Sequence, residues 1–272
     1  SKTRLHGAVA TELRWPWVKS QSAGASHLIE PVAQLVLASN SRSSILNEDS
    51  VLVEFDEGNL FALSRFPGSD AVEDGARANL GLNYLRSDPK GWSLGVTAGR
   101  VVRADDPHLF SPGSGLNGLR SNWMLAAQLD TSKLKLTNRL LFNDDFGVTK
   151  AELAAQLAVA KLGLTVGYVH TVADPSESRN IPIREATLAS SYALTRNWTG
   201  SLGSRYDFES KRMANANGSL VFRNECLLVD LSLSRRFTSS TSVSPTTDFG
   251  LSVELLGFGG SSAVGPARQC RR

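Results

Sequence analysis

The sequence predicts an all-β fold: an antiparallel transmembrane β-barrel, of which this chain supplies about thirteen strands as a fragment of a larger barrel. Three observations lead to this prediction. Apolar and polar residues alternate with a period of two, the connections alternate between short and long, and strand lengths of about 10–12 residues match a tilted bilayer crossing.

The alternation is clearest near the C-terminal end, where one face of a strand is apolar and the other carries small polar groups. The apolar face carries Leu227, Val229, Leu231 and Leu233. Leu228 apart, the opposite face carries Cys226, Asp230, Ser232 and Ser234. A strand with lipid on one side and water on the other needs this pattern.

Comparable patterns recur along the chain. The predicted strands span residues 7–18, 27–38, 75–86, 91–103, 121–130, 133–143, 148–159, 162–172, 184–195, 197–208, 211–223, 225–237 and 247–258. Residues 148–164 are ambiguous, because their Ala, Leu, Glu and Lys content favours a helix. Strict alternation of Ala151, Leu153, Ala155 and Leu157 with their neighbours favours a strand, which we predict.

The predicted connections fall into two sets. The short ones lie at 87–90, 131–132, 160–161, 196 and 224, and the other set lies at 39–74, 104–120, 144–147, 173–183, 209–210 and 238–246. Outer-membrane barrels have short periplasmic turns and long extracellular loops, so this sorting supports a barrel over a soluble β-sandwich.

Composition excludes several classes of protein. No run of about 18 apolar residues exists, so no transmembrane helix is expected. A net charge of +3 gives no argument for nucleic acid. The four histidines show no metal-ligand or catalytic spacing, so we expect no enzyme, no cofactor and no metal. Because no initiator Met or leader is present, we expect either a mature form or, in preference, an excised part of a longer protein.

Three stretches resemble the lipopolysaccharide-assembly protein family of the outer membrane (LptD, or organic solvent tolerance protein), in its C-terminal barrel portion. They are residues 27–40 with 45–84 (HLIEPVAQLVLASN and ILNEDSVLVEFDEGNLFALSRFPGSDAVEDGARANLGLNY), GSLVFRNECLLVDLSLSRRFT, and TTDFGLSVELLGF. They cover about half the chain in the family's order. Some members have two adjacent cysteines at the turn, whereas this chain has Cys226 beside Glu225.

The resemblance implies assembly and export of lipopolysaccharide into the outer leaflet of the cell outer membrane of a Gram-negative bacterium. The expected partners are lipopolysaccharide, outer-membrane lipid, an LptE-like plug lipoprotein, and a periplasmic lipopolysaccharide bridge protein reached through a missing N-terminal domain. The lipid would leave between the first and last strands of the barrel. Two alternatives stay open: a passive porin or autotransporter-type barrel, and a soluble β-sandwich binding module.

Three groups of residues are candidate functional sites. The seam strand is Gly250, Leu251, Ser252, Val253, Glu254, Leu255, Leu256, Gly257 and Phe258. Cys226 is a candidate for a disulfide to another domain, because it falls beside a turn that the topology places at the periplasmic rim. Residues 1–258 are expected to be barrel and residues 259–272 a disordered tail.

The third candidate is the long acidic loop 39–74, extracellular or lumenal. The loop contains eight acidic residues but only two basic ones, Arg42 and Arg65, and it also contains apolar residues of the kind that are usually buried. We therefore expect a folded plug or cap, with a solvated surface loop or a calcium site as alternatives. Its candidate residues are Glu54, Phe55, Asp56, Phe61, Arg65 and Phe66.

Overall fold

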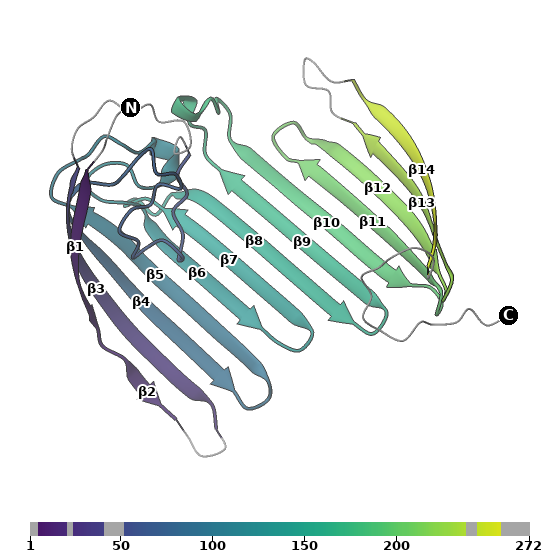
Figure 1. The fold of residues 1–272 in the computed structure, drawn as a ribbon, viewed down its shortest axis with the longest axis horizontal. Helices are drawn as coiled ribbons and strands as arrows, with labels where there is room; N and C mark the ends of the chain where they lie inside the picture. The colour runs from purple at the N-terminus through teal and green to yellow at the C-terminus, as the bar shows by residue number, and fades with distance from the viewer. Residues whose placement is uncertain (1–4, 21–23, 41–51, 238–243, 257–272) are drawn as a thin grey trace. The chain divides into compact units, whose positions relative to one another are not determined.

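The computed structural model describes residues 5–20, 24–40, 52–237 and 244–256. It confirms the predicted fold class: the described residues form a 14-stranded antiparallel sheet with two short 3-10 turns (Figure 1). The strands are β1 (His6–Arg14), β2 (Trp17–Lys19), β3 (Ser26–Asn40), β4 (Gly75–Asp88), β5 (Trp92–Arg103), β6 (Trp123–Asp130), β7 (Leu134–Phe142), β8 (Val148–Val159), β9 (Leu162–Thr171), β10 (Ile183–Ala193), β11 (Trp198–Asp207), β12 (Arg212–Arg223), β13 (Leu227–Arg236) and β14 (Thr246–Leu255). The 3-10 turns are η1 (Pro112–Ser114) and η2 (Pro175–Glu177).

Each strand pairs with its neighbour in the chain, except that β1 pairs with β3 and the short β2 also pairs with β3. The predicted strand 7–18 is divided at Pro16, which explains why the sheet has one strand more than expected. Proline has no N–H and cannot donate to a strand ladder. The ambiguous segment is strand β8, so alternation outweighed helix propensity there.

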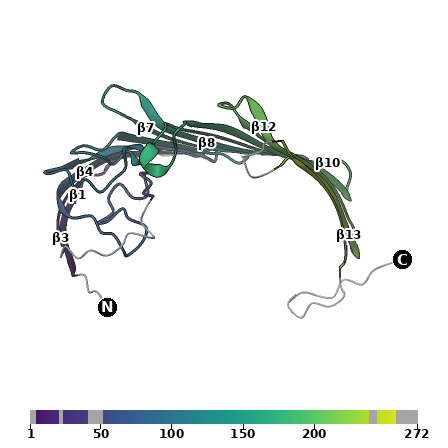
Figure 2. The same cartoon turned by 90° about the horizontal axis from the view of Figure 1, so that it is seen from above.

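The chain divides into two compact units. The first contains residues 1–154 and 169–183. Within its described part, one sheet face exposes apolar side chains such as Leu35 and Leu82, at 62% and 46%. The opposite face holds Gln34 and Asn79, which are buried. We call the first the outer face and the second the inner face, because the loop before β4 lies against the second (Figure 2).

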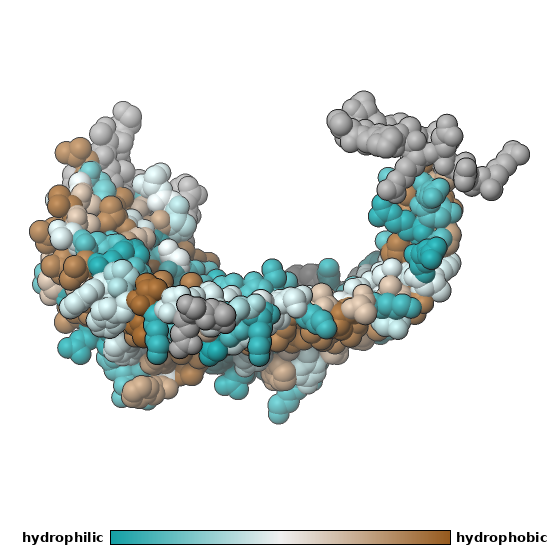
Figure 3. Space-filling model, turned by 90° about the horizontal axis from the view of Figure 1, so that it is seen from below, coloured by the Kyte–Doolittle hydropathy of each residue, from teal (hydrophilic) through white to brown (hydrophobic). Residues whose placement is uncertain are grey.

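The second unit contains residues 155–168 and 184–272. Its cross-strand register sorts side chains in the same way. Leu220, Leu231 and Leu251 are aligned across β12, β13 and β14 on the outer face. One residue along, Ser219 and Ser232 are aligned on the inner face. The space-filling view shows apolar side chains, in brown, beside polar ones along the strands (Figure 3).

These faces fit a sheet with hydrocarbon on one side and water on the other. Among the described residues, no helix is long and apolar enough to cross a membrane.

Two adjacent residues of β13 test the assignment of faces, because Leu231 points outward and Ser232 inward. We expect Leu231→Lys to lower the free energy of unfolding in lipid vesicles by about 2–4 kcal/mol, because a cation would enter hydrocarbon. Ser232→Lys keeps its charge on the wet face and should change stability by less than about 1 kcal/mol. Denaturant titration of both variants measures the difference, and equal losses would contradict the assignment.

Candidate functional site on the inner wall

The segment from Leu52 to Asp74, which we call the cap loop, folds onto the inner face of the first unit. A tight turn shapes its start: the Asp56 carboxylate accepts hydrogen bonds from the backbone N–H of Gly58 (2.9 Å) and Asn59 (3.1 Å). The Asn59 side chain donates to the Glu54 carbonyl at 2.7 Å. These bonds satisfy the backbone where no strand partner exists. β3 continues to Asn40, so the loop begins slightly later than predicted, and residues 41–51 lie outside the described residues.

Apolar contacts hold the cap loop against the wall. Phe55, Leu60 and Phe66 are buried in one cluster with wall residues that include Met124 and Leu141. Leu60 is fully buried, and full burial of a leucine side chain contributes about 1.5–3 kcal/mol. Of the predicted cap residues, the structure buries Phe55, Arg65 and Phe66 and partly buries Phe61; Asp56 forms the turn.

Two glycines make room for this contact. Gly81 of β4 and Gly99 of β5 are directly opposite in the sheet register. A Cβ added at Gly81 would lie 2.6 Å from the Phe61 ring, and one at Gly99 would collide with Leu60. The pair therefore forms a depression in the wall that any larger side chain would fill.

Glu73, at the end of the cap loop, is the centre of a buried ionic network. Its carboxylate accepts from Arg65 at 2.7 Å and from Arg103 at 2.9 Å, and Arg77 lies 3.8 Å away. Side chains of all four residues are at most 2% exposed. Burial lowers the pKa of Arg65 from its ordinary value, and the Glu73 charge opposes this effect. The cap loop thus joins the wall through charge as well as apolar contact.

The network continues through side chains of the sheet. Arg65 donates to Asn79 at 2.8 Å, Asn79 donates to Gln34 at 2.6 Å, and Gln34 donates to Glu12 at 2.8 Å. These residues lie on β4, β3 and β1, so the chain of hydrogen bonds crosses three strands. Sequence patterns did not mark Glu73, Arg77 or Arg103 as site residues. Alternation put Arg77 on the polar face of its strand, but only the fold of the cap loop over β4 and β5 brings Glu73 to the two arginines.

A second set of ion pairs is more exposed. Glu57 of the cap loop makes a bidentate contact with Arg139 of β7, with oxygen–nitrogen distances of 2.7–2.9 Å. Glu54 lies 3.4 Å from Lys150 of β8. Burial raises the pKa of Glu57, but hydrogen bonds from Arg139 and the backbone outweigh it and leave this pKa below its ordinary value. A cavity of about 30 Å³ is lined by Glu54, Arg139 and Lys150.

Two other loops of the first unit, between β5 and β6 and between β9 and β10, are joined by hydrogen bonds. Asp174, between β9 and β10, accepts from the Gly113 N–H at 2.5 Å, and Ser111 donates to Glu177. Burial raises the pKa of Asp174, but hydrogen bonds from Ser176 and Gly113 and the Arg179 charge leave it lowered overall. These hydrogen bonds fix η1 and η2 beside each other.

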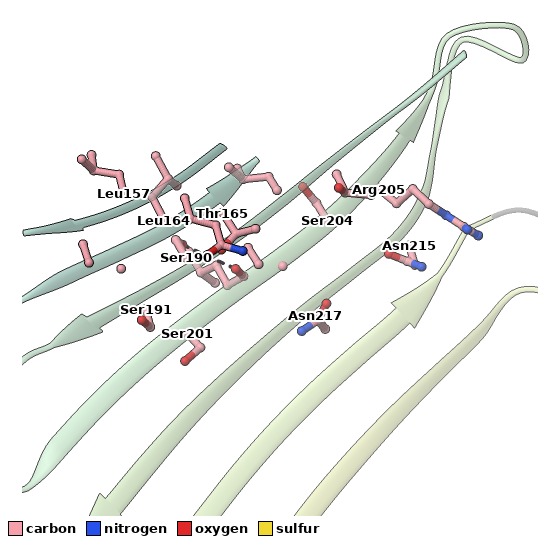
Figure 4. A pocket seen from close by; sticks show the side chains of 18 residues that line it. Leu157, Leu164, Thr165, Ser190, Ser191, Ser201, Ser204, Arg205, Asn215 and Asn217 are labelled. Atoms are coloured by element: carbon pink, nitrogen blue, oxygen red, sulfur yellow. Dashed lines mark hydrogen bonds between the residues drawn. The ribbon is translucent and has the colours of Figure 1, made fainter. Parts of the chain in front are cut away.

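The inner face of the second unit carries small polar side chains. An open groove of about 620 Å³ crosses it, and Figure 4 shows Ser191, Ser201 and Asn217 on the neighbouring strands β10, β11 and β12. Gly203 lies opposite Asn217, and a Cβ there would approach the Asn217 amide oxygen to 2.5 Å. This surface is polar and shallow, whereas the inner face of the first unit is charged and covered.

The remaining predicted site residues lie in the second unit. Gly250 to Leu255 belong to β14, Leu256 follows it, and Gly257 and Phe258 lie outside the described residues. β14 pairs only with β13 within the described part of the chain. Cys226 takes part in a disulfide bond, and a bond from it to another domain stays a prediction. Nowhere in the described ranges do three His, Cys, Asp or Glu side chains form a metal-binding group.

A continuous sheet with an apolar outer face and a polar, loop-covered inner face defines part of a membrane β-barrel. Comparison with known families gives the particular class: residues 1–198 match LptD, described as LPS transport system D, and the chain belongs to this family. Family and sheet together place the chain in an outer-membrane barrel, and the family is a transport family rather than an enzyme family.

Solved structures give weaker similarities. A triple mutant of the Rhodopseudomonas blastica porin is 12% identical, with 94% of this chain and 91% of that chain covered and a TM-score of 0.38. A second mutant of this porin is 12% identical, with 92% and 90% covered and a TM-score of 0.37. No curated protein matches the chain.

The buried network can be tested by removing its one carboxylate. We expect Glu73→Gln to lower the free energy of unfolding by about 3–5 kcal/mol, because the buried arginines would lose their counter-charge. Denaturant titration in vesicles measures this, and protease cleavage at Phe55 or Phe66 should become faster. Glu57→Gln, in the same loop, is the matched control and should cost less than about 1 kcal/mol. Equal effects of the two variants would contradict the network's role.

Proposed function

We propose that this chain forms the C-terminal part of a barrel that assembles lipopolysaccharide in the outer membrane of a Gram-negative bacterium. The observation that carries the proposal is membership of the LptD family over residues 1–198. The structure supports it with a polar inner face that suits sugar and phosphate groups and an apolar outer face that suits acyl chains. In this proposal no residue of the chain acts as a catalyst.

In the proposed mechanism the last strand is the seam. Opening a closed barrel costs ladder hydrogen bonds in lipid, so lateral export needs one weak junction. β14 stands at the end of the described sheet and pairs with β13. Its inner face carries Gly250 and Ser252, and its outer face carries Leu251 and Val253. Head groups would follow the inner side while acyl chains pass outward.

The proposed partners follow from the family. They are an LptE-like plug lipoprotein inside the barrel, a periplasmic lipopolysaccharide bridge protein that delivers the lipid through an N-terminal domain, and the surrounding outer-membrane lipid. The cap loop would act as a lumenal cap beside the plug.

A passive porin is the second candidate, because acidic cap residues facing Arg139 and Lys150 also fit the charged constriction of a porin. Controlled depletion of the protein in cells separates the two functions. We expect surface lipopolysaccharide, measured by antibody binding to intact cells, to fall while lipopolysaccharide accumulates inside. Unchanged surface lipopolysaccharide with reduced uptake of small solutes would favour the porin.

The proposed inter-domain disulfide at Cys226 is tested separately. Cys226 is next to the turn at Asn224, whose side chain accepts from its N–H at 2.9 Å. A bond from this turn would hold the receiving domain over the barrel opening. Non-reducing electrophoresis of the full-length protein should show that Cys226→Ser changes mobility and reduces surface lipopolysaccharide. Cys270→Ser is the matched control. If Cys270→Ser changes mobility and surface lipopolysaccharide as much as Cys226→Ser does, the bond joins Cys226 to the C-terminal tail and not to another domain.

A further inference from the structure

We infer that Arg139 and Lys150 form a binding site for phosphate groups of the exported amphiphile, and that the cap carboxylates Glu57 and Glu54 occupy this site in the closed state. The inference rests on the proposed function, because only that function brings a phosphorylated lipid to the inner face. It adds a ligand site and a gate to it.

The two cations have the geometry of an anion site. Arg139 on β7 and Lys150 on β8 lie on neighbouring strands and both approach Glu152, at 3.7 Å and 2.9 Å. A planar guanidinium binds carboxylate and phosphate oxygens in the same bidentate manner, and an ammonium group adds a point charge. Glu152, on the sheet itself, contacts both cations and remains when the cap carboxylates leave.

The carboxylates of Glu57 and Glu54 contact the two cations in the positions where phosphate oxygens would bind. Glu57 offers both oxygens to Arg139, as a phosphate would, and Glu54 approaches Lys150 from the same turn. Glu57 already occupies the Nε and Nη2 donors of Arg139. A phosphate group therefore reaches these donors only where it displaces the Glu57 carboxylate.

Displacement requires little rearrangement. The Glu54 side chain is 76% exposed and the Glu57 side chain 30%, so rotation of both side chains into water frees the cations. Exposed ion pairs are weak and screened by salt. Phe55, between them in sequence, is 2% exposed and keeps the loop in place while the carboxylates leave.

The two attachments of the cap loop therefore differ. At Glu73 the carboxylate is buried with its arginines and does not exchange with a ligand. At Glu57 the ion pair is accessible and exchangeable. An arriving phosphorylated lipid would thus release one end of the cap loop and leave the other attached.

The test measures lipid affinity of the purified full chain in neutral detergent at fixed salt. The probe is phosphatidic acid in micelles, with phosphatidylcholine micelles and inorganic phosphate as separate arms. We expect Arg139→Ala to weaken phosphatidic acid binding about tenfold or more, because charged hydrogen bonds are lost. Glu57→Gln should tighten it about two- to fivefold, because the competing carboxylate is gone.

Matched controls come from the inner face of the second unit, where Arg205 and Glu185 form an ion pair of similar exposure at 3.7 Å. Arg205→Ala and Glu185→Gln should bind phosphatidic acid as the wild type does. Wild-type affinity in Arg139→Ala, or no tighter binding in Glu57→Gln, would overturn the inference. Equally tight binding of inorganic phosphate would overturn its assignment to a lipid. The depletion experiment above tests the proposed function independently, since micelle binding does not depend on export.

Discussion

Pairing of backbone groups is the constraint on which the rest of this structure depends. In hydrocarbon every N–H and C=O must be satisfied by a neighbouring strand, so the described part of the chain forms one ladder from β1 to β14. Once the register is fixed, alternation assigns each side chain to lipid or to the interior. A one-residue slip at β13 would place Ser232 in lipid and Leu231 inside. The register therefore also determines which side chains of the inner face are available to contact the loops.

That wall explains why the cap loop folds against the sheet. A long loop over a purely polar surface would bury little apolar area. Here Gly81 and Gly99 leave a depression in which Leu60 is buried. Glu73 then supplies the counter-charge for arginines that the register has buried. Apolar burial gives the attachment its strength, and the charge network fixes its position, because each hydrogen bond has one geometry.

Local sequence was sufficient for the strands and insufficient for the site. Period-two patterns predicted each strand to within a few residues, even at β8 where propensity favoured helix. Phe55 and Phe66 could be recognised as residues that need burial. Glu73 could not be distinguished from the other acidic loop residues, because its partners Arg65 and Arg103 lie 8 and 30 residues away and meet only in the folded wall. Arg77 and Arg103 are paired on the neighbouring strands β4 and β5, but Glu73 and Arg65 reach them only through the fold of the cap loop, which strand periodicity does not specify.

Facing charges by themselves do not distinguish a fixed constriction from a gate; the difference lies in how firmly each end is held. A solute channel requires a constriction that stays in place. A bulky amphiphile requires the obstruction to yield on one side without leaving the barrel. The cap loop has a buried attachment at Glu73 and an exposed one at Glu57, and local opening begins where buried contacts are fewest. Release of the Glu57 end also frees the cations Arg139 and Lys150 to bind phosphate. Phosphate binding and opening of the cap loop would therefore occur together.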